Sequence, residues 1–482
     1  MRWLFLRALG LTYLAAFSSL AVQVRGLYGR RGILPIHELV DGERAVRRRE
    51  HWRELPTLFW FGTSDRALVL TCRLGQLASL LLTFNVAPRL ALAALWTTYA
   101  SFVTAGRDFL AFQWDALLLE TTVHALLIAP PGLRPGLGRD EPPRQAVLLL
   151  RWLVFRLNYQ SGVAKLRSGD PTWRDRTACC YHFETQPLPT PLGWHVHQLP
   201  APVKRLVTSA VLACECYAPA LIFARRGLRR LGFLLLSGLQ GAIALTGNYA
   251  FFNLLSGALT LWTLDDRALP RALSRKSRRP GRRAGPLRQI VGGLVGVVVV
   301  AVSAGQHLIR YGRRSPPKVV RSAIQRLQPL ESINTYGLFS VMTTRRREIA
   351  IEGSNDGVTW LEYEFRYKPG NPKAAPRWVA PHQPRLDWQM WFAALQPPPL
   401  WFVRLLVRLL QGAPDVLALF KSVPFPERPP RYVRAIIRDY RMTTRETRRR
   451  TGAWWERGEP ELYFPPVSLA GPIARPEGSR VA

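Results

Sequence analysis

Cysteine, lysine and acidic side chains are all scarce in this sequence. Its 482 residues include five Cys, an odd number dispersed along a long chain, which excludes the disulfide framework typical of small secreted domains. Asp and Glu number 32 against 67 Lys and Arg, and only seven of those bases are Lys, so Arg carries the formal net charge of +35. The preference for Arg indicates a GC-rich coding bias as much as a function.

The sequence also lacks the short motifs of several enzyme classes. It has no G-x-S-x-G nucleophile elbow, no Walker loop and no glycine-rich dinucleotide fingerprint. A lipase-type hydrolase is therefore disfavoured, and no cofactor is predicted.

Long apolar stretches bounded by arginine clusters are present instead. A basic chain can bind nucleic acid, but arginines that flank apolar stretches are typical of membrane topology signals. We therefore predict the lipid bilayer as a partner, and no nucleic acid. About nine stretches approach the ~20 residues that a helix needs to cross ~30 Å of hydrocarbon, and the short last-but-one is a candidate for a re-entrant or tilted segment. They cover residues 8–24, 67–86, 88–106, 109–130, 145–163, 203–224, 229–246, 249–264 and 287–305.

Arginine-rich loops predict the orientation of these spans. Residues 225–230 and 265–288 are strongly basic, and residues 131–144 carry Arg134, Arg139 and Arg144; such loops belong on the cytoplasmic side. Alternating crossings then place the N-terminus in the cytoplasm. The polar segments 25–66 and 164–202 and everything after residue 305 fall on the outer side.

The composition changes after Gly305. Residues 306–345 look basic and irregular, whereas residues 347–367 alternate apolar and polar side chains around a Gly-Ser-Asn-Asp-Gly turn, which predicts a β-hairpin. Residues 386–420 look helical, and residues 431–443 look like a long strand.

From these patterns we expect three parts. Residues 1–305 form an α-helical multi-pass membrane bundle of about nine spans. Residues 306–466 form a β-rich extracytoplasmic domain with a helical insertion, distantly similar to a galactose-binding-like sandwich. Residues 467–482 form a disordered tail.

The polar stretch from Arg151 to Pro200 is dense in Trp, His and Pro, unlike a solvated linker, so we expect an ordered surface. It contains SGVAKLRSGDPTWRD and YHFETQPLPTPLGW, and LTGNYAFFNLL, IEGSNDGVTWLEYEFRYKPG, VAPHQPRLDWQMWFAAL and PPRYVRAIIRDYRMT follow later. With these motifs the chain resembles, roughly from Arg7 to Pro466, the lipase maturation factor family of multi-pass membrane proteins.

This resemblance implies a chaperone-like membrane protein that helps secreted lipases, or other exported proteins, reach their active, assembled form. The C-terminal domain would contact the client. The implied location is the endoplasmic reticulum membrane; in a bacterial source, which the arginine-rich composition suggests, the plasma membrane would take its place.

A second hypothesis is a membrane enzyme with a carboxylase-like bundle. SGVAKLRSGDPTW resembles, over a dozen residues, a stretch of the vitamin K-dependent carboxylase family in which a lysine acts as base. That implies Lys165 as the base, with Asp170, Trp173 and His182 around it. The structural alternative, which we favour, is that Lys165 anchors a helix end, with its stem lying in the bilayer edge and its ammonium in water.

Asp115 and Glu120 lie inside a predicted span. Ionisable groups at membrane depth are costly and normally pair inside the protein. We expect them to form buried ion pairs with Arg151 or Arg156 of a neighbouring span; a proton or substrate path is the alternative.

His182, His195 and His197 raise the question of a metal site. A His-x-His in an extended segment would place both rings on one side, and Cys179 and Cys180 could add ligands. The spacing matches no zinc signature, so no metal is predicted. The adjacent cysteines are no C-x-x-C motif, so a redox role is a minor hypothesis.

Finally, the predicted topology brings separate polar segments to one outer surface. The two segments are residues 164–202 and 246–253. At a membrane edge, such polar segments must satisfy their backbone groups against each other or against the outer domain. Tryptophan and arginine also dominate interface hot spots, although these tryptophans could equally be core. The candidate client-binding or structural residues are Trp173, Arg174, Asp175, Tyr181, His182, Glu184, Asn248, Tyr249, Arg385, Asp387, Trp388 and Trp391.

Overall fold

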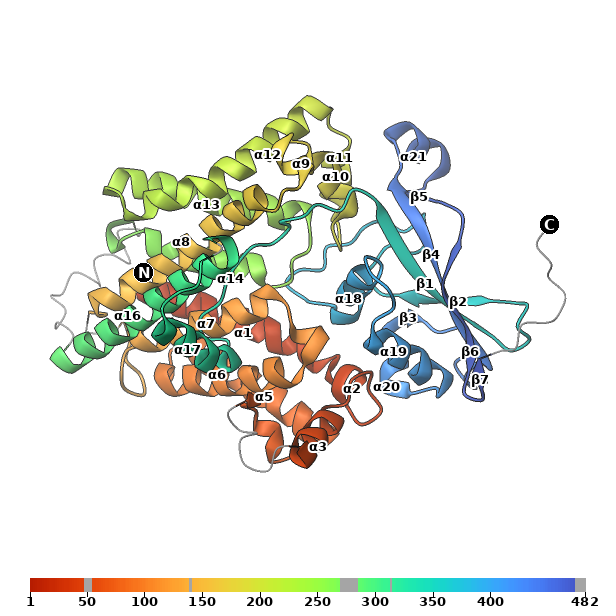
Figure 1. Ribbon diagram of the computed structural model, residues 1–482, viewed down its shortest axis with the longest axis horizontal. Coiled ribbons are helices and arrows are strands. Elements are labelled where there is room, and N and C mark those ends of the chain that lie inside the picture. The colour runs from red at the N-terminus through yellow and green to blue at the C-terminus, as the bar shows by residue number, and fades with distance from the viewer. Residues whose placement is uncertain (47–53, 138–140, 269–284, 313, 473–482) are drawn as a thin grey trace.

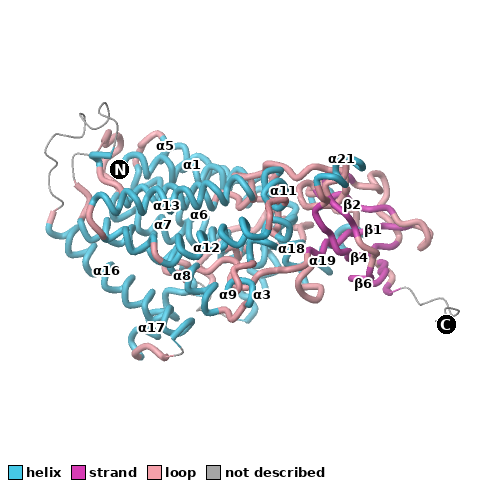
Figure 2. The backbone as a smooth tube through the Cα atoms, turned by 90° about the horizontal axis from the view of Figure 1, so that it is seen from above, coloured by secondary structure: helices cyan, strands magenta, loops and turns pink. Residues whose placement is uncertain are grey.

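The computed structural model describes residues 1–46, 54–137, 141–268, 285–312 and 314–472. A helical N-terminal region and a C-terminal β-sheet domain lie end to end along the long axis of the molecule (Figure 1). Most long helices run along this axis, and the strands gather at the end that carries the C-terminus (Figure 2).

Every predicted span coincides with a helix. These helices are α1 (Arg2–Ala21), α5 (Asp65–Thr83), α6 (Pro88–Ala105), α7 (Gln113–Ile128), α8 (Arg144–Arg167), α12 (Ala201–Cys216), α13 (Arg226–Thr246), α14 (Phe252–Thr260) and α16 (Pro286–His307). Five segments of the described chain are long and apolar enough to cross a membrane, namely Arg2–Ala21, Asp65–Thr83, Ala201–Phe223, Arg226–Thr246 and Pro286–Gly312. Since nine helical residues measure only about 14 Å, α14 is too short to cross ~30 Å of hydrocarbon.

The loops that were predicted to be cytoplasmic meet at one end of the bundle. Arg2 donates to the carbonyl of Ile128 at 3.4 Å, and Arg226 pairs with Asp265 at 2.7 Å. The Met1 amino group pairs with Asp266. This is the arrangement that alternating crossings require, although residues 269–284 of the longest basic loop lie outside the described residues.

Short helices build the polar segments at the other end. Asp170 accepts a hydrogen bond from the N–H of Thr172, and Thr190 accepts one from Gly193, so both cap the helices that follow them. The short helices of the N-terminal region are α2 (Val24–Tyr28), α3 (Ile36–Val46), α9 (Pro171–Arg174), α10 (Ala178–Thr185) and α11 (Pro191–His197). Single turns are η1 (Leu58–Trp60), η2 (Arg107–Leu110), η3 (Ala218–Phe223), η4 (Leu261–Thr263) and η5 (Asp266–Ala268).

The segment after α16 differs from its expected irregular, external course. A turn, η6 (Leu308–Gly312), leads to helix α17 (Lys318–Leu327) and the turn η7 (Gln328–Leu330), and α17 folds back onto α16 beside the bundle (Figure 2). Gly305 permits this close packing, because a Cβ there would lie 2.6 Å from Val320. The chain then runs along α7 and α8 before the first strand begins. The backbone can enter the bundle because polar side chains there accept and donate its hydrogen bonds.

The C-terminal domain is built on one seven-stranded antiparallel sheet in the order β3-β2-β1-β4-β6-β7, with β5 also paired to β4. The predicted hairpin is β1 and β2, paired with Ile351 opposite Tyr363, and the predicted long strand is β4. Between β1 and β2, Asp356 accepts hydrogen bonds from the N–H groups of Val358 and Thr359 at 2.8 Å each. The strands are β1 (Arg346–Ser354), β2 (Leu361–Phe365), β3 (Phe420–Ser422), β4 (Tyr432–Met442), β5 (Trp455–Arg457), β6 (Glu461–Ser468) and β7 (Gly471–Pro472).

Helices pack against this sheet where a sandwich would have a second sheet. Leu405 and Leu409 of α19 are fully buried, and Phe402 packs edge-on against Tyr463 at a ring-centroid distance of 5.3 Å. Helices therefore replace the facing sheet in the described residues, and the sandwich expectation was wrong. The helices are α18 (Arg385–Ala393), α19 (Leu400–Leu410), α20 (Pro414–Leu417) and α21 (Arg445–Thr451). Residues 467–472, which were expected to begin a disordered tail, instead pair as the end of β6 and as β7; residues 473–482 lie outside the described residues.

Candidate functional site between the bundle and the sheet domain

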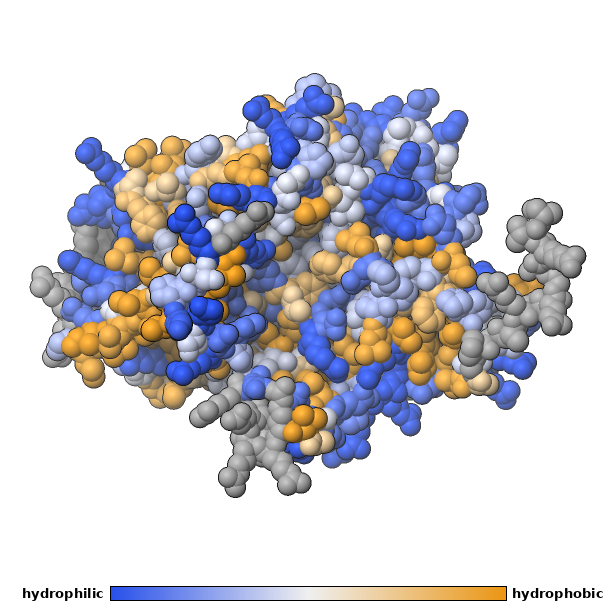
Figure 3. All heavy atoms as spheres, in the orientation of Figure 1, coloured by the Kyte–Doolittle hydropathy of each residue, from blue (hydrophilic) through white to orange (hydrophobic). Residues whose placement is uncertain are grey.

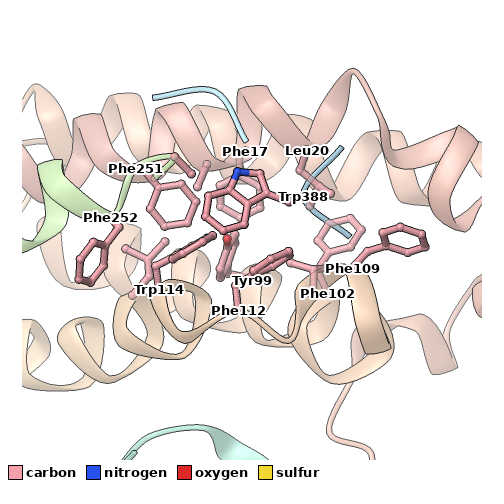
Figure 4. Packing of buried hydrophobic residues seen from close by; sticks show 14 of the residues in the cluster. Phe17, Leu20, Tyr99, Phe102, Phe109, Phe112, Trp114, Phe251, Phe252 and Trp388 are labelled. Carbon is pink, nitrogen blue, oxygen red and sulfur yellow. The ribbon is translucent and has the colours of Figure 1, made fainter. Parts of the chain in front are cut away.

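Helix α18 joins the two domains. Its Trp388 is 2% exposed, and its indole lies among aromatic side chains of the bundle (Figure 4). The ring centroid is 4.9 Å from that of Trp114 and 5.8 Å from that of Tyr249. Bundle and sheet residues consequently belong to one continuous apolar core. We call the whole contact between the sheet domain and the bundle the interdomain interface.

A buried ion pair holds α18 in place. The Arg385 guanidinium donates to both carboxylate oxygens of Asp115, at 2.9 and 3.0 Å, and both side chains are at most 1% exposed. Tyr99 donates to the same carboxylate at 2.5 Å. Asp115 was expected to pair with Arg151 or Arg156. It pairs with Arg385 because it lies in the first turn of α7 at the interdomain interface, more than one turn nearer the sheet domain than Glu120.

The second acidic residue of α7 pairs within the bundle. Glu120 and Arg156 form a fully buried ion pair. Tyr336 donates its hydroxyl to Glu120 at 2.5 Å, and the Asn334 N–H donates at 2.9 Å, so the segment that follows α17 completes the site. Arg151 instead donates to a backbone carbonyl of η4 at 2.9 Å.

Asn248 connects three segments of the chain. Its side-chain oxygen accepts hydrogen bonds from the N–H groups of Val379 and Ala380 at 2.7 and 3.0 Å. Its amide donates to the carbonyls of Leu188 at 3.1 Å and Arg377 at 2.8 Å. The side chain therefore satisfies backbone groups of both domains.

The neighbouring Tyr249 is also satisfied internally. It is 2% exposed, and its hydroxyl lies 3.2 Å from Nε2 of His182 and donates to Gln186 at 2.9 Å. Burial, together with the nearby Lys165 ammonium, lowers the pKa of His182 to about 4. His182 is therefore a neutral hydrogen-bonding group at physiological pH.

Arg346 makes the densest set of contacts between the sheet domain and the polar segment. It donates to the carbonyls of Glu184 and Pro187 at 2.8 Å each, and also to that of Gln186, and it pairs with Glu348 at 2.6 Å. Sequence reasoning missed it because it stands within three consecutive arginines. Alternation along β1, which turns the middle one inward, was the available signal.

Lys165 is paired. Its ammonium lies 2.7 Å from a carboxylate oxygen of Glu215 on α12 and 5.3 Å from the centre of the Trp173 ring. Trp173 is 4% exposed and donates to the carbonyl of Phe339 at 3.0 Å. The Lys165 and Glu215 side chains therefore satisfy each other between α8 and α12. Lys165 is therefore buried and paired inside the protein, and the expectation that its ammonium lies in water at the membrane edge was wrong.

Asp170 contacts the same stretch of chain that leads to β1. Besides capping α9, it accepts a hydrogen bond from the N–H of Met342 at 2.5 Å. These backbone hydrogen bonds lower its pKa despite the opposing effect of burial. It therefore serves as an acceptor that holds the C-terminal segment.

His182, His195 and His197 lie on two helices, α10 and α11. His195 and His197 lie on helix α11, where two residues apart point in different directions, so the assumption of an extended His-x-His was wrong. His197 lies 3.2 Å from Glu184, and His195 packs edge-on against Trp194. No group of three or more His, Cys, Asp or Glu that could hold a metal occurs in the described part of the chain. Cys179 and Cys180, like the other described cysteines, are free thiols.

The remaining candidates divide into buried and exposed residues. Asp387 accepts hydrogen bonds from two backbone N–H groups at 2.8 Å each, and burial raises its pKa to about 6. Trp391 donates to the carbonyl of Thr185 at 2.7 Å. Arg174, Asp175 and Tyr181 are exposed. Trp391, like Arg385 and Asn248, therefore connects the sheet domain to the bundle, whereas Asp387 is satisfied within the sheet domain.

The chain matches two family models. Residues 1–271 match the lipase maturation factor transmembrane domain, and residues 332–465 match the lipase maturation factor C-terminal domain. The chain is similar to lipase maturation factor 2 of Gallus gallus, with 35% identity over 98% of this chain and 82% of the relative. It is also similar to lipase maturation factor 1 of Mus musculus, with 31% identity over 97% of this chain and 87% of the relative. No solved structure matches it.

Proposed function

Since the chain belongs to the lipase maturation factor family, we propose that it is a non-enzymatic, chaperone-like membrane protein that helps secreted lipases reach their active form. The lipase clients follow from the names of the relatives. The endoplasmic reticulum membrane in a eukaryote, or the plasma membrane in a bacterium, is the location that this function requires.

The observation that carries the proposal is the buried contact that attaches the sheet domain to the bundle. The Arg385–Asp115 pair and the insertion of Trp388 hold that domain at one end of the candidate spans. A client that binds the sheet domain is then held at a fixed height above the membrane.

Exposed apolar side chains on the sheet domain are the candidate client contacts. Trp378, Leu395 and Leu400 are 56%, 48% and 66% exposed. They lie outside the network of the interdomain interface, so their substitution should weaken client binding without loosening the domain.

The proposal is tested by co-expressing a secreted lipase with the full-length protein in cells that lack their own family member. The readout is lipase activity per mass of secreted lipase. Wild type should raise it, Trp378→Ala with Leu400→Ser should reduce the gain, and the exposed-arginine control Arg428→Gln should not. Equal lipase activity with and without the protein would overturn the proposal.

The enzyme alternative receives a separate test at Lys165. Lys165→Arg keeps a cation opposite Glu215 but removes a group that can act as a base. Retained lipase maturation by this variant, at wild-type protein levels, supports the chaperone-like function. Complete loss of maturation without loss of protein would favour the enzyme.

A further inference from the structure

A groove with an aromatic floor lies where α21 of the sheet domain meets α11 of the bundle. Its volume is about 660 Å³, and its lining includes Trp194, Trp454, Arg445, Arg448 and Arg449. The two indole rings meet edge to face with centroids 5.4 Å apart. We call it the arginine groove. Figures 1 and 2 both show α21 beside α11.

One guanidinium in this groove is stacked on an indole. The central carbon of Arg448 lies 3.4 Å from the centre of the Trp454 ring and 4.6 Å from that of Trp194. Stacking on aromatic faces fixes the plane of a guanidinium while leaving its N–H donors free for a ligand. Trp194 also has a buried indole N–H without a hydrogen-bond partner among the described residues.

The charge of the groove is not balanced locally. Among the ion pairs of the described residues, none includes Arg445, Arg448 or Arg449. Glu446 is the one acidic residue on α21, and it is exposed. Hydrophilic residues accordingly cover this part of the molecule (Figure 3).

The position of the groove points to the membrane surface. Helix α11 ends at His197, and α12, which begins the candidate span Ala201–Phe223, follows after a three-residue link. Gln198 in that link donates to the carbonyl of Thr443, directly before α21, at 3.2 Å. Leu206, on the first turns of α12, is 70% exposed, as a lipid-facing residue should be. Tryptophan and arginine at the end of a span are typical of headgroup contact.

We propose that the arginine groove binds the phosphate headgroup of an anionic lipid in the leaflet next to the sheet domain. Arg448 presents its donors from the face of Trp454 beside Trp194, Arg445 and Arg449 add positive charge at the rim, and the acyl chains extend along α12. Guanidinium groups bind phosphate through paired, charge-assisted hydrogen bonds. The proposal concerns a lipid site and does not depend on the client.

The test uses the full-length protein in a neutral detergent. Native mass spectrometry and thermal melting follow titration with dioctanoyl phosphatidylglycerol, with dioctanoyl phosphatidylcholine as the zwitterionic match. Inorganic phosphate and a polyglutamate peptide form two further titrations. The test variant is Arg445→Gln with Arg449→Gln, and the matched control is Arg428→Gln with Arg431→Gln, which removes the same charge from exposed positions elsewhere in the sheet domain.

We expect wild type and control to bind the anionic lipid equally and the test variant to bind it at least tenfold more weakly. Arg448→Lys, which keeps the charge but loses the planar fork, should also weaken binding. Equal binding of both lipids, or equal loss in test and control variants, would overturn the proposal. So would protection by polyglutamate or phosphate that matches protection by the lipid, since the acyl chains would then contribute nothing.

Discussion

The interdomain interface and the arginine groove both join the bundle to the sheet domain through arginines and tryptophans, but they use them differently. At the interface, Arg385 and Arg346 are buried, and each pairs with a carboxylate and donates to backbone carbonyls. In the groove, Arg448 is stacked on the Trp454 indole beside Trp194 and has no carboxylate partner among the described residues.

The difference shows that an arginine can either stabilise the contact between two domains or remain available to bind a ligand. A buried guanidinium must be paired, because removing its partner leaves a desolvated charge. A partly exposed guanidinium stacked on aromatic rings keeps its hydration and its donors. Pairing therefore marks the arginines that position domains, and its absence at a rigid, partly exposed site marks those available for binding.

The largest expected effect comes from breaking the interface pair. Asp115→Asn leaves Arg385 buried without its counter-charge, which should destabilise the protein by about 3–5 kcal/mol. Yield and melting temperature in detergent measure it. The exposed Asp175→Asn is the matched control and should behave as wild type. An Asp115→Asn protein with unchanged yield and melting would show that the pair does not hold the domains together.

Removing Trp173 should have the next largest effect. Trp173→Ala loses a buried ring that packs over Lys165 and the hydrogen bond to Phe339, at a cost of about 3 kcal/mol. Lipase maturation should fall with it. The exposed neighbour Arg174→Ala is the control. If stability and lipase maturation both survived the loss of Trp173, this part of the interface would have no structural role.

Acid should destabilise the interface through His182. Its folded pKa of about 4 lies below its ordinary value of about 6.5, so the unfolded chain takes up a proton that the native state excludes. Its contribution is present above pH 6.5 and is lost as the pH falls toward 4, by up to about 2 kcal/mol for this half-buried ring.

Melting curves of wild type and His182→Gln between pH 7.5 and 4.5 test this prediction. The variant should lose less stability on acidification than wild type. Asp387, with a raised pKa of about 6, contributes with the opposite sign, because its contribution is present at low pH and is lost as the pH rises through 6. Comparing the two proteins at each pH cancels that contribution. If the stabilities of wild type and His182→Gln fell in parallel with pH, the low pKa assigned to His182 would be contradicted.

The smallest effect is expected where the arginines are unpaired. Arg445→Gln with Arg449→Gln should change the free energy of unfolding by no more than about 0.5 kcal/mol, as for exposed positions in general. Arg385→Gln, by contrast, should destabilise strongly because Asp115 would remain buried alone. Equal melting shifts in these two variants would erase the distinction between the two regions.

Local patterns in the sequence determined the elements of this protein. Apolar length predicted where the long helices lie, arginine-rich loops predicted which helix ends meet, and alternation around Asp356 predicted the β1–β2 hairpin. These features depend on neighbours in the chain, on the length of an apolar run and on the period of a strand, so they can be read without a structure. The motifs in the polar segments likewise indicated the family.

Partner choice was decided by the tertiary structure alone. Asp115 pairs with Arg385, 270 residues away, rather than with an arginine of a neighbouring span. Asn334 and Tyr336 donate hydrogen bonds to Glu120, which places their segment beside the bundle. Arg346 is buried, whereas the arginines on either side of it form ion pairs at the surface. A buried charge takes whichever partner the packing brings within hydrogen-bond distance, and that packing sums contacts over the whole chain. The sequence could therefore predict that these charges need partners, but only the folded arrangement of both domains determined which ones they have.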